Sequence, residues 1–150
     1  MLMNEIYSGL WMGSEPIAPT QYYDEFDTIV YAASGIKPNY KKFPEKSLLY
    51  VPLLDLRGEK LEAGTFEKAE QMAIWVAKDI KAGKQVLVTC AAGINRSGLI
   101  VALALRLLTG WPGIKCVEEV RNKRVFALTN EDFVHFISSL LSREPLSLTT

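Results

Sequence analysis

The sequence predicts an α/β fold, in which a central, mostly parallel and twisted sheet of about four to five strands is flanked by helices. Two apolar runs of strand length, residues 48–54 and 85–89, enclose residues 65–82, where apolar side chains recur at helical spacing. Strand, helix and strand in this order form a right-handed crossover, which makes the two strands parallel. Their carboxyl ends then lie at one edge of the sheet, where α/β proteins bind their ligands.

Two further strands and a central helix complete this sheet and its cover. Residues 28–33 are β-branched or aromatic enough for a short strand, and residues 5–11 are expected to form an edge strand. The strand at 85–89 is apolar enough to be buried on both faces. Residues 97–108 are apolar on nearly all sides, which predicts a helix in the middle of the protein that ends at Gly110.

Capping residues mark the ends of two other helices. Thr65 is the predicted N-cap of the helix at 65–82, and Gly83 is its predicted stop. A last helix is expected to begin at Thr129, whose hydroxyl stands at the capping-box distance from Asp132. It would bury Phe133, Phe136, Ile137 and Leu140.

Composition indicates one globular domain over residues 1–150, with residues 142–150 as an expected disordered tail. The chain is 49% hydrophobic and 23% charged, which excludes collagen-like, disordered and disulfide-scaffold classes. Its 17 basic and 17 acidic residues leave a formal net charge of zero. Binding to a nucleic-acid backbone needs a clustered basic surface, so we expect no obligate nucleic-acid partner.

The same inventory predicts a cytoplasmic protein without a membrane segment, and we expect a monomer. The longest apolar run, residues 99–105, is far shorter than the roughly 20 residues of a membrane span. Two cysteines fit a reducing compartment, and the first residues lack the basic and apolar regions expected of a signal peptide. One histidine and two distant cysteines make no metal-ligand cluster, so we expect neither metal nor cofactor.

The segment at 88–98 combines the parts of a phosphate-binding site with a nucleophile. Cys90 follows a buried strand, and a short loop of small residues then leads into a helix. Such a loop can turn its backbone N–H groups inward to form an anion nest at a helix N-terminus. The same positive field favours the thiolate of Cys90. Arg96 offers a planar fork to two oxygens of a bound anion.

Asp55 is the candidate general acid, because it follows the strand at 48–54 and should lie at the same sheet edge as Cys90. An Asp in this place can also be a turn former or a helix cap. The alternative acids are Glu59, Glu62 and Asp24.

The loop Thr-Cys-Ala-Ala-Gly-Ile-Asn-Arg-Ser-Gly resembles the signature loop of the cysteine-dependent dual-specificity protein phosphatases. Cysteine, Gly at the third place after it, Arg at the sixth and Ser at the seventh all agree. Residues 6–14 resemble the opening strand of this family, 51–55 its general-acid loop and 127–133 the start of its last helix. The resemblance covers roughly residues 6–141 and implies a phosphatase fold.

The resemblance also implies a role for each site residue. Cys90 would attack phosphorus, Arg96 would bind the phosphate, and Asp55 would protonate the leaving oxygen and then activate water. Ser97 would bind the sulfur and help it to leave. The phosphate-binding residues would be Ala91, Ala92, Gly93, Ile94, Asn95 and Arg96.

The substrate implied by the resemblance is a protein that carries phosphotyrosine, and also phosphoserine or phosphothreonine. Alternatives are RNA 5′-phosphates or phosphoinositides, although a loop without lysine disfavours an inositol headgroup. The family normally has His before the nucleophile, where this chain has Thr89, whose hydroxyl can bond backbone but cannot carry positive charge. This departure leaves open a phosphate-binding module without turnover. Basic side chains that would either rim the site or stay solvated are Arg57, Lys60, Arg121, Lys123 and Arg124.

Overall fold

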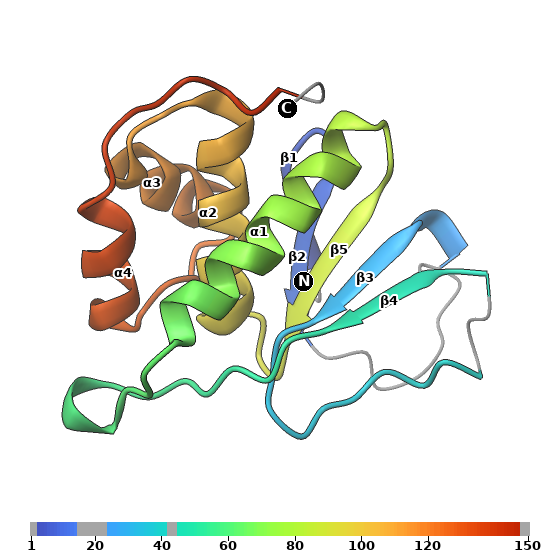
Figure 1. The fold of residues 1–150 in the computed structure, drawn as a ribbon, viewed down its shortest axis with the longest axis horizontal. Helices are drawn as coiled ribbons and strands as arrows, with labels where there is room; N and C mark the ends of the chain where they lie inside the picture. The colour runs from blue at the N-terminus through green and yellow to red at the C-terminus, as the bar shows by residue number, and fades with distance from the viewer. Residues whose placement is uncertain (1–2, 15–23, 42–44, 148–150) are drawn as a thin grey trace.

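The computed structural model describes residues 3–14, 24–41 and 45–147 and confirms the predicted α/β class. Its five-stranded sheet has the order β1-β2-β5-β3-β4, in which β1 is antiparallel to β2 and every other pair is parallel. Figure 1 shows the carboxyl ends of β3, β4 and β5 together at one edge of this sheet. The strands are β1 (Met3–Tyr7), β2 (Leu10–Ser14), β3 (Thr28–Tyr31), β4 (Ser47–Tyr50) and β5 (Val86–Cys90).

The helices build the main core against one face of the sheet. Alternate strand residues such as Met12, Val30 and Val88 share this core with side chains from all four α-helices. On the opposite face, Ile29 and Leu87 belong to a smaller cluster. The helices are α1 (Thr65–Lys81), α2 (Arg96–Thr109), α3 (Gly113–Lys123) and α4 (Glu131–Ser138), with a 3-10 turn at Gly58–Lys60.

β5 is the central strand, and all five of its residues are buried, as its apolar sequence predicts. The crossover from β4 through α1 to β5 makes these two strands parallel, but they are not neighbours. β3 lies between them, where Thr28 pairs with Ser47 on one side and with Val86 on the other. The predicted common edge for the residues that follow β4 and β5 is therefore present.

The N-terminal segment differs from the single edge strand expected at residues 5–11. It forms a hairpin in which only β1 is at the edge, while β2 pairs with β5. Gly9 makes the turn with a φ of +84°, which a side chain would disfavour, and its N–H donates to Glu5 Oε2 at 3.1 Å. The strand expected at 48–54 ends at Tyr50, two residues before Pro52.

Two predicted helix starts are wrong by one residue. Gly64 precedes α1 with a φ of +82°, and Thr65 is the first helical residue, whose hydroxyl donates back to Glu62 O at 2.9 Å. At α4 the N-cap is Asn130 instead of Thr129, because the Asn130 side chain accepts from two N–H groups of the first turn. The predicted stop of α2 is confirmed, since Gly110 caps it with a φ of +78°.

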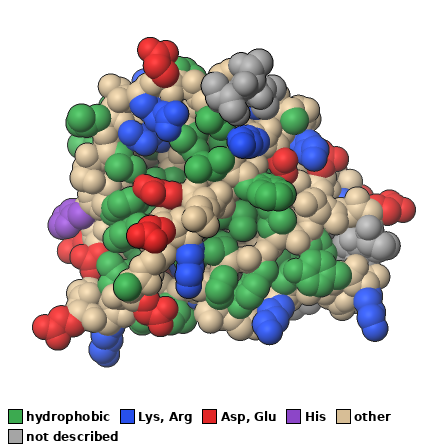
Figure 2. All heavy atoms as spheres, in the orientation of Figure 1, with side chains coloured by type: hydrophobic (Ala, Val, Ile, Leu, Met, Phe, Trp, Pro, Cys, Tyr) green, Lys and Arg blue, Asp and Glu red, His purple; other side chains and the backbone are tan. Residues whose placement is uncertain are grey.

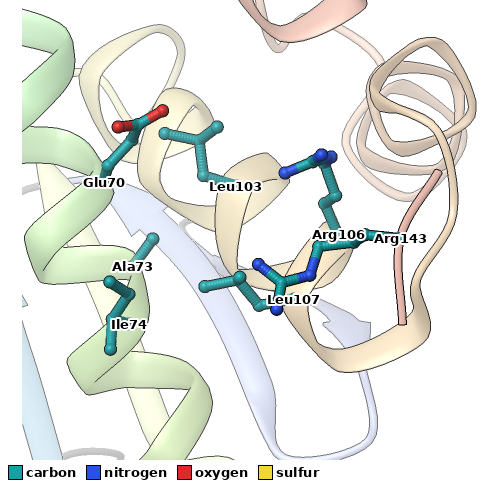
Figure 3. A pocket seen from close by; sticks show the side chains of 7 residues that line it. All are labelled: Glu70, Ala73, Ile74, Leu103, Arg106, Leu107 and Arg143. Carbon is teal, nitrogen blue, oxygen red and sulfur yellow. The ribbon is translucent and has the colours of Figure 1, made fainter. Parts of the chain in front are cut away.

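The C-terminal segment is held to α2 further than the sequence predicts. Arg143 N donates to Gly110 O at 2.9 Å and Leu146 N to Leu107 O at 2.7 Å. Figure 3 shows Arg143 close to Arg106 at a pocket of about 190 Å³ between α1 and α2. The expected disordered tail therefore does not begin at residue 142, and residues 148–150 lie outside the described part.

α1 leaves apolar side chains at the surface, as Figure 2 shows by the hydrophobic groups that lie among charged ones on the face that α1 crosses. Ile74 is 41% exposed and Trp75 is 55% exposed.

Among the described residues no single helix is long and apolar enough to span a membrane. α2 and α3 reach the required length and composition only as a pair, bent by 119°.

Cys116 of α3 is the packed thiol that its sequence setting suggests, with no exposed surface. Burial raises the pKa of the Cys116 thiol to about 11, against the smaller opposing effects of Arg106 and Lys115. Because the thiolate is the reactive form, this side chain keeps its proton and stays unreactive at neutral pH.

We therefore predict that iodoacetamide at pH 8 does not modify Cys116 in the folded protein. Mass spectrometry of the digested protein checks this, with a urea-unfolded sample as the control in which Cys116 must react. Modification of Cys116 in the native protein at the unfolded rate would contradict its burial in α3.

Candidate active site

Cys90 ends β5, and its sulfur faces the first turn of α2. The residue is 4% exposed, and Sγ lies 3.2 Å from the hydroxyl of Ser97, which is fully buried. The chain leaves the sheet at Cys90, turns through residues 91–95 and begins α2 at Arg96. The structure thus places the predicted nucleophile and the predicted leaving-group helper in direct contact.

The peptide groups of the loop are oriented by hydrogen bonds on their carbonyl oxygens. Arg124 Nε donates to Gly93 O at 2.7 Å, its Nη2 donates to Ala92 O at 3.4 Å, and the backbone N–H of Leu128 donates to Ile94 O at 2.9 Å. In a trans peptide the N–H points opposite to the C=O, and no described peptide is cis. The N–H groups of residues 93–95 therefore point to the other side of the loop, away from Arg124.

These N–H groups remain available to a ligand. In the part of the chain that the structure describes, no backbone N–H from residues 91–95 donates to a protein acceptor. The loop also precedes the N-terminus of α2, where the helix dipole favours negative charge. Inward N–H groups without protein acceptors at a helix N-terminus are the arrangement that an anion nest requires.

Only glycine fits at position 93, because the backbone conformation disfavours a side chain and the backbone of β2 leaves no room for one. Its φ is +68°, and a Cβ built on it would lie 2.4 Å from the carbonyl carbon of Gly13 in β2. β2 runs beside β5, and Ser14 pairs with Cys90 at the ends of the two strands. The loop therefore rests directly on the backbone of β2.

Arg96 lies between the loop and the segment that carries Asp55. Its Nη1 donates to Leu53 O at 3.3 Å, while its Nε is buried without an acceptor among the described residues. A buried donor without an acceptor typically costs about 1–3 kcal/mol, and more when it is charged. A phosphate oxygen is an acceptor that would satisfy this nitrogen.

Asp55 is connected to the loop by two amide side chains. Its Oδ2 accepts from Asn95 Nδ2 at 2.9 Å, and its Oδ1 accepts from Asn130 Nδ2 at 2.7 Å. Asn95 is itself a loop residue and is 5% exposed. Each carboxylate oxygen thus has one amide donor, and Asp55 is held at the loop although it is exposed.

The three alternative acids have no such connection. Glu59, Glu62 and Asp24 are exposed, and within the described ranges none of their carboxylates forms a hydrogen bond to the loop. Among the candidates raised by the sequence, Asp55 is the carboxylate that the structure brings to Cys90's loop.

Asn130 is a site residue that sequence reasoning missed. Its Oδ1 caps α4 by accepting from Asp132 N and Phe133 N, and its Nδ2 donates to Asp55 Oδ1 and to Leu56 O. Its backbone N–H donates to Asn95 Oδ1 at 2.8 Å. The signal in the sequence was an Asn beside the expected cap, but its partners lie far away along the chain.

Arg124 is the second missed residue, since the sequence left it as a rim or surface charge. Besides the loop carbonyls it donates from Nη1 to Asn4 Oδ1 at 2.8 Å. Burial lowers the pKa of the Arg124 guanidinium, and the charge of a Cys90 thiolate opposes that shift.

Thr89 makes the backbone bond that its residue type suggests. It is 1% exposed, and its hydroxyl donates to Val30 O of the neighbouring strand at 2.8 Å. The residue therefore joins β5 to β3 directly before Cys90.

Comparison with known proteins identifies the fold. No family model matches the sequence, and no curated protein matches it. Solved structures do match: human DUSP28 has a TM-score of 0.77 at 19% identity, with 93% of this chain and 94% of that chain covered. The human tyrosine phosphatase-like serine/threonine/tyrosine-interacting protein has a TM-score of 0.76 at 21% identity, with 91% and 93% covered. PTPMT1 in complex with PI(5)P has a TM-score of 0.75 at 15% identity, with 93% and 94% covered. The chain has the fold of the dual-specificity phosphatases.

The close approach of Gly93 to the backbone of β2 can be tested by adding a side chain at this position. Gly93→Ala should destabilise the protein by more than the roughly 1–2 kcal/mol that a side chain costs at positive φ, and should weaken inorganic phosphate binding by about tenfold or more. Chemical denaturation and titration calorimetry measure the two effects.

Gly35→Ala is the matched control, because Gly35 also has a positive φ, of +84°, but nothing lies within 4 Å of its added Cβ. Gly35→Ala should lower the free energy of unfolding only by the roughly 1–2 kcal/mol that a side chain costs at positive φ, and it should bind phosphate normally. Equal losses of stability in the two variants would show that the loop does not rest on β2.

Proposed function

We propose that this protein is a phosphomonoester hydrolase that works through a phosphocysteine intermediate. The observation that carries the proposal is the contact of Cys90 Sγ with Ser97 Oγ, at 3.2 Å. The loop that follows Cys90 has its carbonyl oxygens bonded to Arg124 and to Leu128 N, so its N–H groups face the opposite side. The buried Nε of Arg96 supports an anionic substrate. The fold shared with dual-specificity phosphatases agrees with this activity.

In the first step, the Cys90 thiolate attacks phosphorus, and the bond between phosphorus and the leaving oxygen breaks. Asp55 gives its proton to that oxygen, so the product leaves as a neutral alcohol or phenol. The loop N–H groups and Arg96 bind the three remaining phosphoryl oxygens, where charge accumulates in phosphoryl transfer.

In the second step, water attacks phosphorus and the bond from phosphorus to sulfur breaks. The Asp55 carboxylate accepts a proton from that water, and inorganic phosphate is released. The sulfur leaves as a thiolate, which the Ser97 hydroxyl stabilises by donating a hydrogen bond across the 3.2 Å contact. Both catalytic groups return to their starting protonation states.

The proposed substrates are proteins that carry phosphotyrosine and also phosphoserine or phosphothreonine, and the proposed location is the cytoplasm. Asp55 is exposed, so a phosphorylated side chain of a folded protein can reach it. One structural neighbour was solved with PI(5)P, a phosphoinositide, and another is named an interacting protein. A phosphoinositide substrate and a module without turnover are therefore the alternatives that the tests must separate.

The first test is the release of phosphate from p-nitrophenyl phosphate. The parent protein should turn it over, and Cys90→Ser should lose essentially all turnover, because a hydroxyl is a far weaker nucleophile than a thiolate. Cys116→Ser is the matched control and should retain turnover. A parent protein that binds phosphate but releases none from this substrate would contradict the hydrolase and support the binding module.

The second test concerns Asp55 and its amide donors. Asp55→Asn should slow hydrolysis of alkyl phosphates by about 10²–10⁴-fold, and should affect p-nitrophenyl phosphate much less, because nitrophenolate leaves without a proton. Steady-state kinetics on both substrates measure the difference.

Asn95→Ala alone should slow the hydrolysis of alkyl phosphates, but less than Asp55→Asn does. Added to Asp55→Asn, it should slow hydrolysis little further, because both substitutions act on the same proton transfer. Thr129→Val is the control, because Thr129 bonds to Asn95 but not to Asp55. Equal losses from Asp55→Asn on alkyl and aryl substrates would remove Asp55 from the role of general acid.

A further inference from the structure

The segment that carries Asp55 has little packing of its own to hold it in place. It connects β4 to α1, and Figure 1 shows it reaching the side of the molecule where α4 lies. Residues 55–60 are exposed apart from the half-buried Leu56, and the 3-10 turn contains no buried residue. Segments with so few buried contacts open easily, so the position of Asp55 depends on hydrogen bonds to the rest of the protein.

Three of these hydrogen bonds come from the start of α4. Asn130 Nδ2 donates to Asp55 Oδ1 at 2.7 Å and to Leu56 O at 3.0 Å. Asp132 Oδ2 accepts from Gly58 N at 2.7 Å. The segment is therefore bonded to α4 at three of its residues, directly before its 3-10 turn and at the first residue of that turn.

The side chain of Asn130 is fully buried and uses all four of its hydrogen-bonding positions. Its Oδ1 accepts from Asp132 N and Phe133 N, which caps α4. Its Nδ2 supplies both N–H groups to Asp55 and Leu56. A flipped amide would bring Nδ2 to two N–H donors, so the bonds themselves fix its orientation. The oxygen of this side chain thus serves the helix, and its nitrogen serves the segment that carries Asp55.

Asp55 keeps sites for a proton while it is held. The two oxygens of a carboxylate together have about four acceptor sites. Within the described ranges, Asn130 occupies one site on Oδ1 and Asn95 occupies one on Oδ2. Because the Asp55 side chain is exposed, the other sites are open to a proton and to the leaving oxygen of a substrate.

We propose that Asn130 is a positioning residue, which holds Asp55 at the loop after Cys90 before a substrate binds. The inference rests on the proposed function, because it gives Asn130 a part in the proton transfer by Asp55. An acid that is already in place does not have to be ordered during the reaction, and a small misplacement slows the chemical step. Asp132 supports the same arrangement through Gly58 but does not contact Asp55.

The test is Asn130→Ser, because Ser caps a helix about as well as Asn but is shorter and lacks the nitrogen that donates to Asp55. The variant should lower kcat for an alkyl phosphate by about tenfold or more, with little change in KM. It should leave kcat for p-nitrophenyl phosphate within about twofold, since nitrophenolate leaves without a proton. Added to Asp55→Asn, it should slow alkyl phosphate hydrolysis little further.

Glu131→Ser is the matched control. Glu131 is the first residue of α4 and is exposed, and in the part of the chain that the structure describes its side chain has no hydrogen bond to residues 55–58. This variant places the same new side chain beside the cap and should retain the parent's kcat for both substrates.

A second measurement reads the segment without any turnover. Arg57 and Lys60 are exposed trypsin sites within it. Trypsin should cleave after these residues about tenfold faster in Asn130→Ser than in the parent, because two hydrogen bonds that hold the segment are lost and cleavage needs the opened segment. Cleavage after Lys84, which is exposed in the turn between α1 and β5, should not change.

The two measurements separate failure of this inference from failure of the proposed function. A parent protein without turnover would contradict the proposed function, and with it the part of Asn130 in proton transfer, even where cleavage after Arg57 becomes faster. In a parent that does turn over, equal slowing of both substrates by Asn130→Ser, or no slowing of the alkyl phosphate, would overturn the positioning role alone. Unchanged cleavage after Arg57 and Lys60 would overturn it as well, because other contacts would then hold the segment.

Discussion

The capture of three loop carbonyls by Arg124 and by the N–H of Leu128 is the interaction on which the site depends. A peptide group presents either its oxygen or its N–H to a given side, and an oxygen turned inward would repel phosphate. The molecule has a formal net charge of zero, so attraction for an anion must come from local groups. Arg124 orients two of these peptide groups and places a positively charged side chain against the loop.

The start of α4 joins parts of the site that are distant in sequence. Asn130 caps the helix, donates to Asp55 and holds Asn95 through its backbone N–H, while Asp132 accepts from Gly58 N at 2.7 Å. Just before it, Leu128 has a φ of +59°, which costs a non-glycine residue about 1–2 kcal/mol. The bond from Leu128 N to Ile94 O and the bond from Arg121 to Leu128 O offset this cost and place the strained residue where the loop needs it.

Features set by local sequence were predictable, and features set by distant backbone atoms were not. A buried strand, small residues and a helix start predict the loop after Cys90, because each acts on its immediate neighbours. Arg124 could not be assigned, since its acceptors are carbonyl oxygens 31 and 32 residues away. Thr129 and Asn130 are both good caps, and only the tertiary contacts to Asn95 and Asp55 decide between them. Likewise nothing local shows that β3 separates β4 from β5.

The turn between α3 and α4 combines residues that bond to the loop with residues that are exposed. Arg124 and Leu128 hold the loop and are themselves buried or clamped, whereas Val125 and Phe126, between them, project into solvent. A substitution of Val125 or Phe126 leaves the hydrogen bonds to the loop carbonyls intact. Those bonds come from the side chain of Arg124 and from the backbone N–H of Leu128. The orientation of the loop peptides therefore depends on the two ends of this turn, Arg124 and Leu128, and not on the two exposed residues between them.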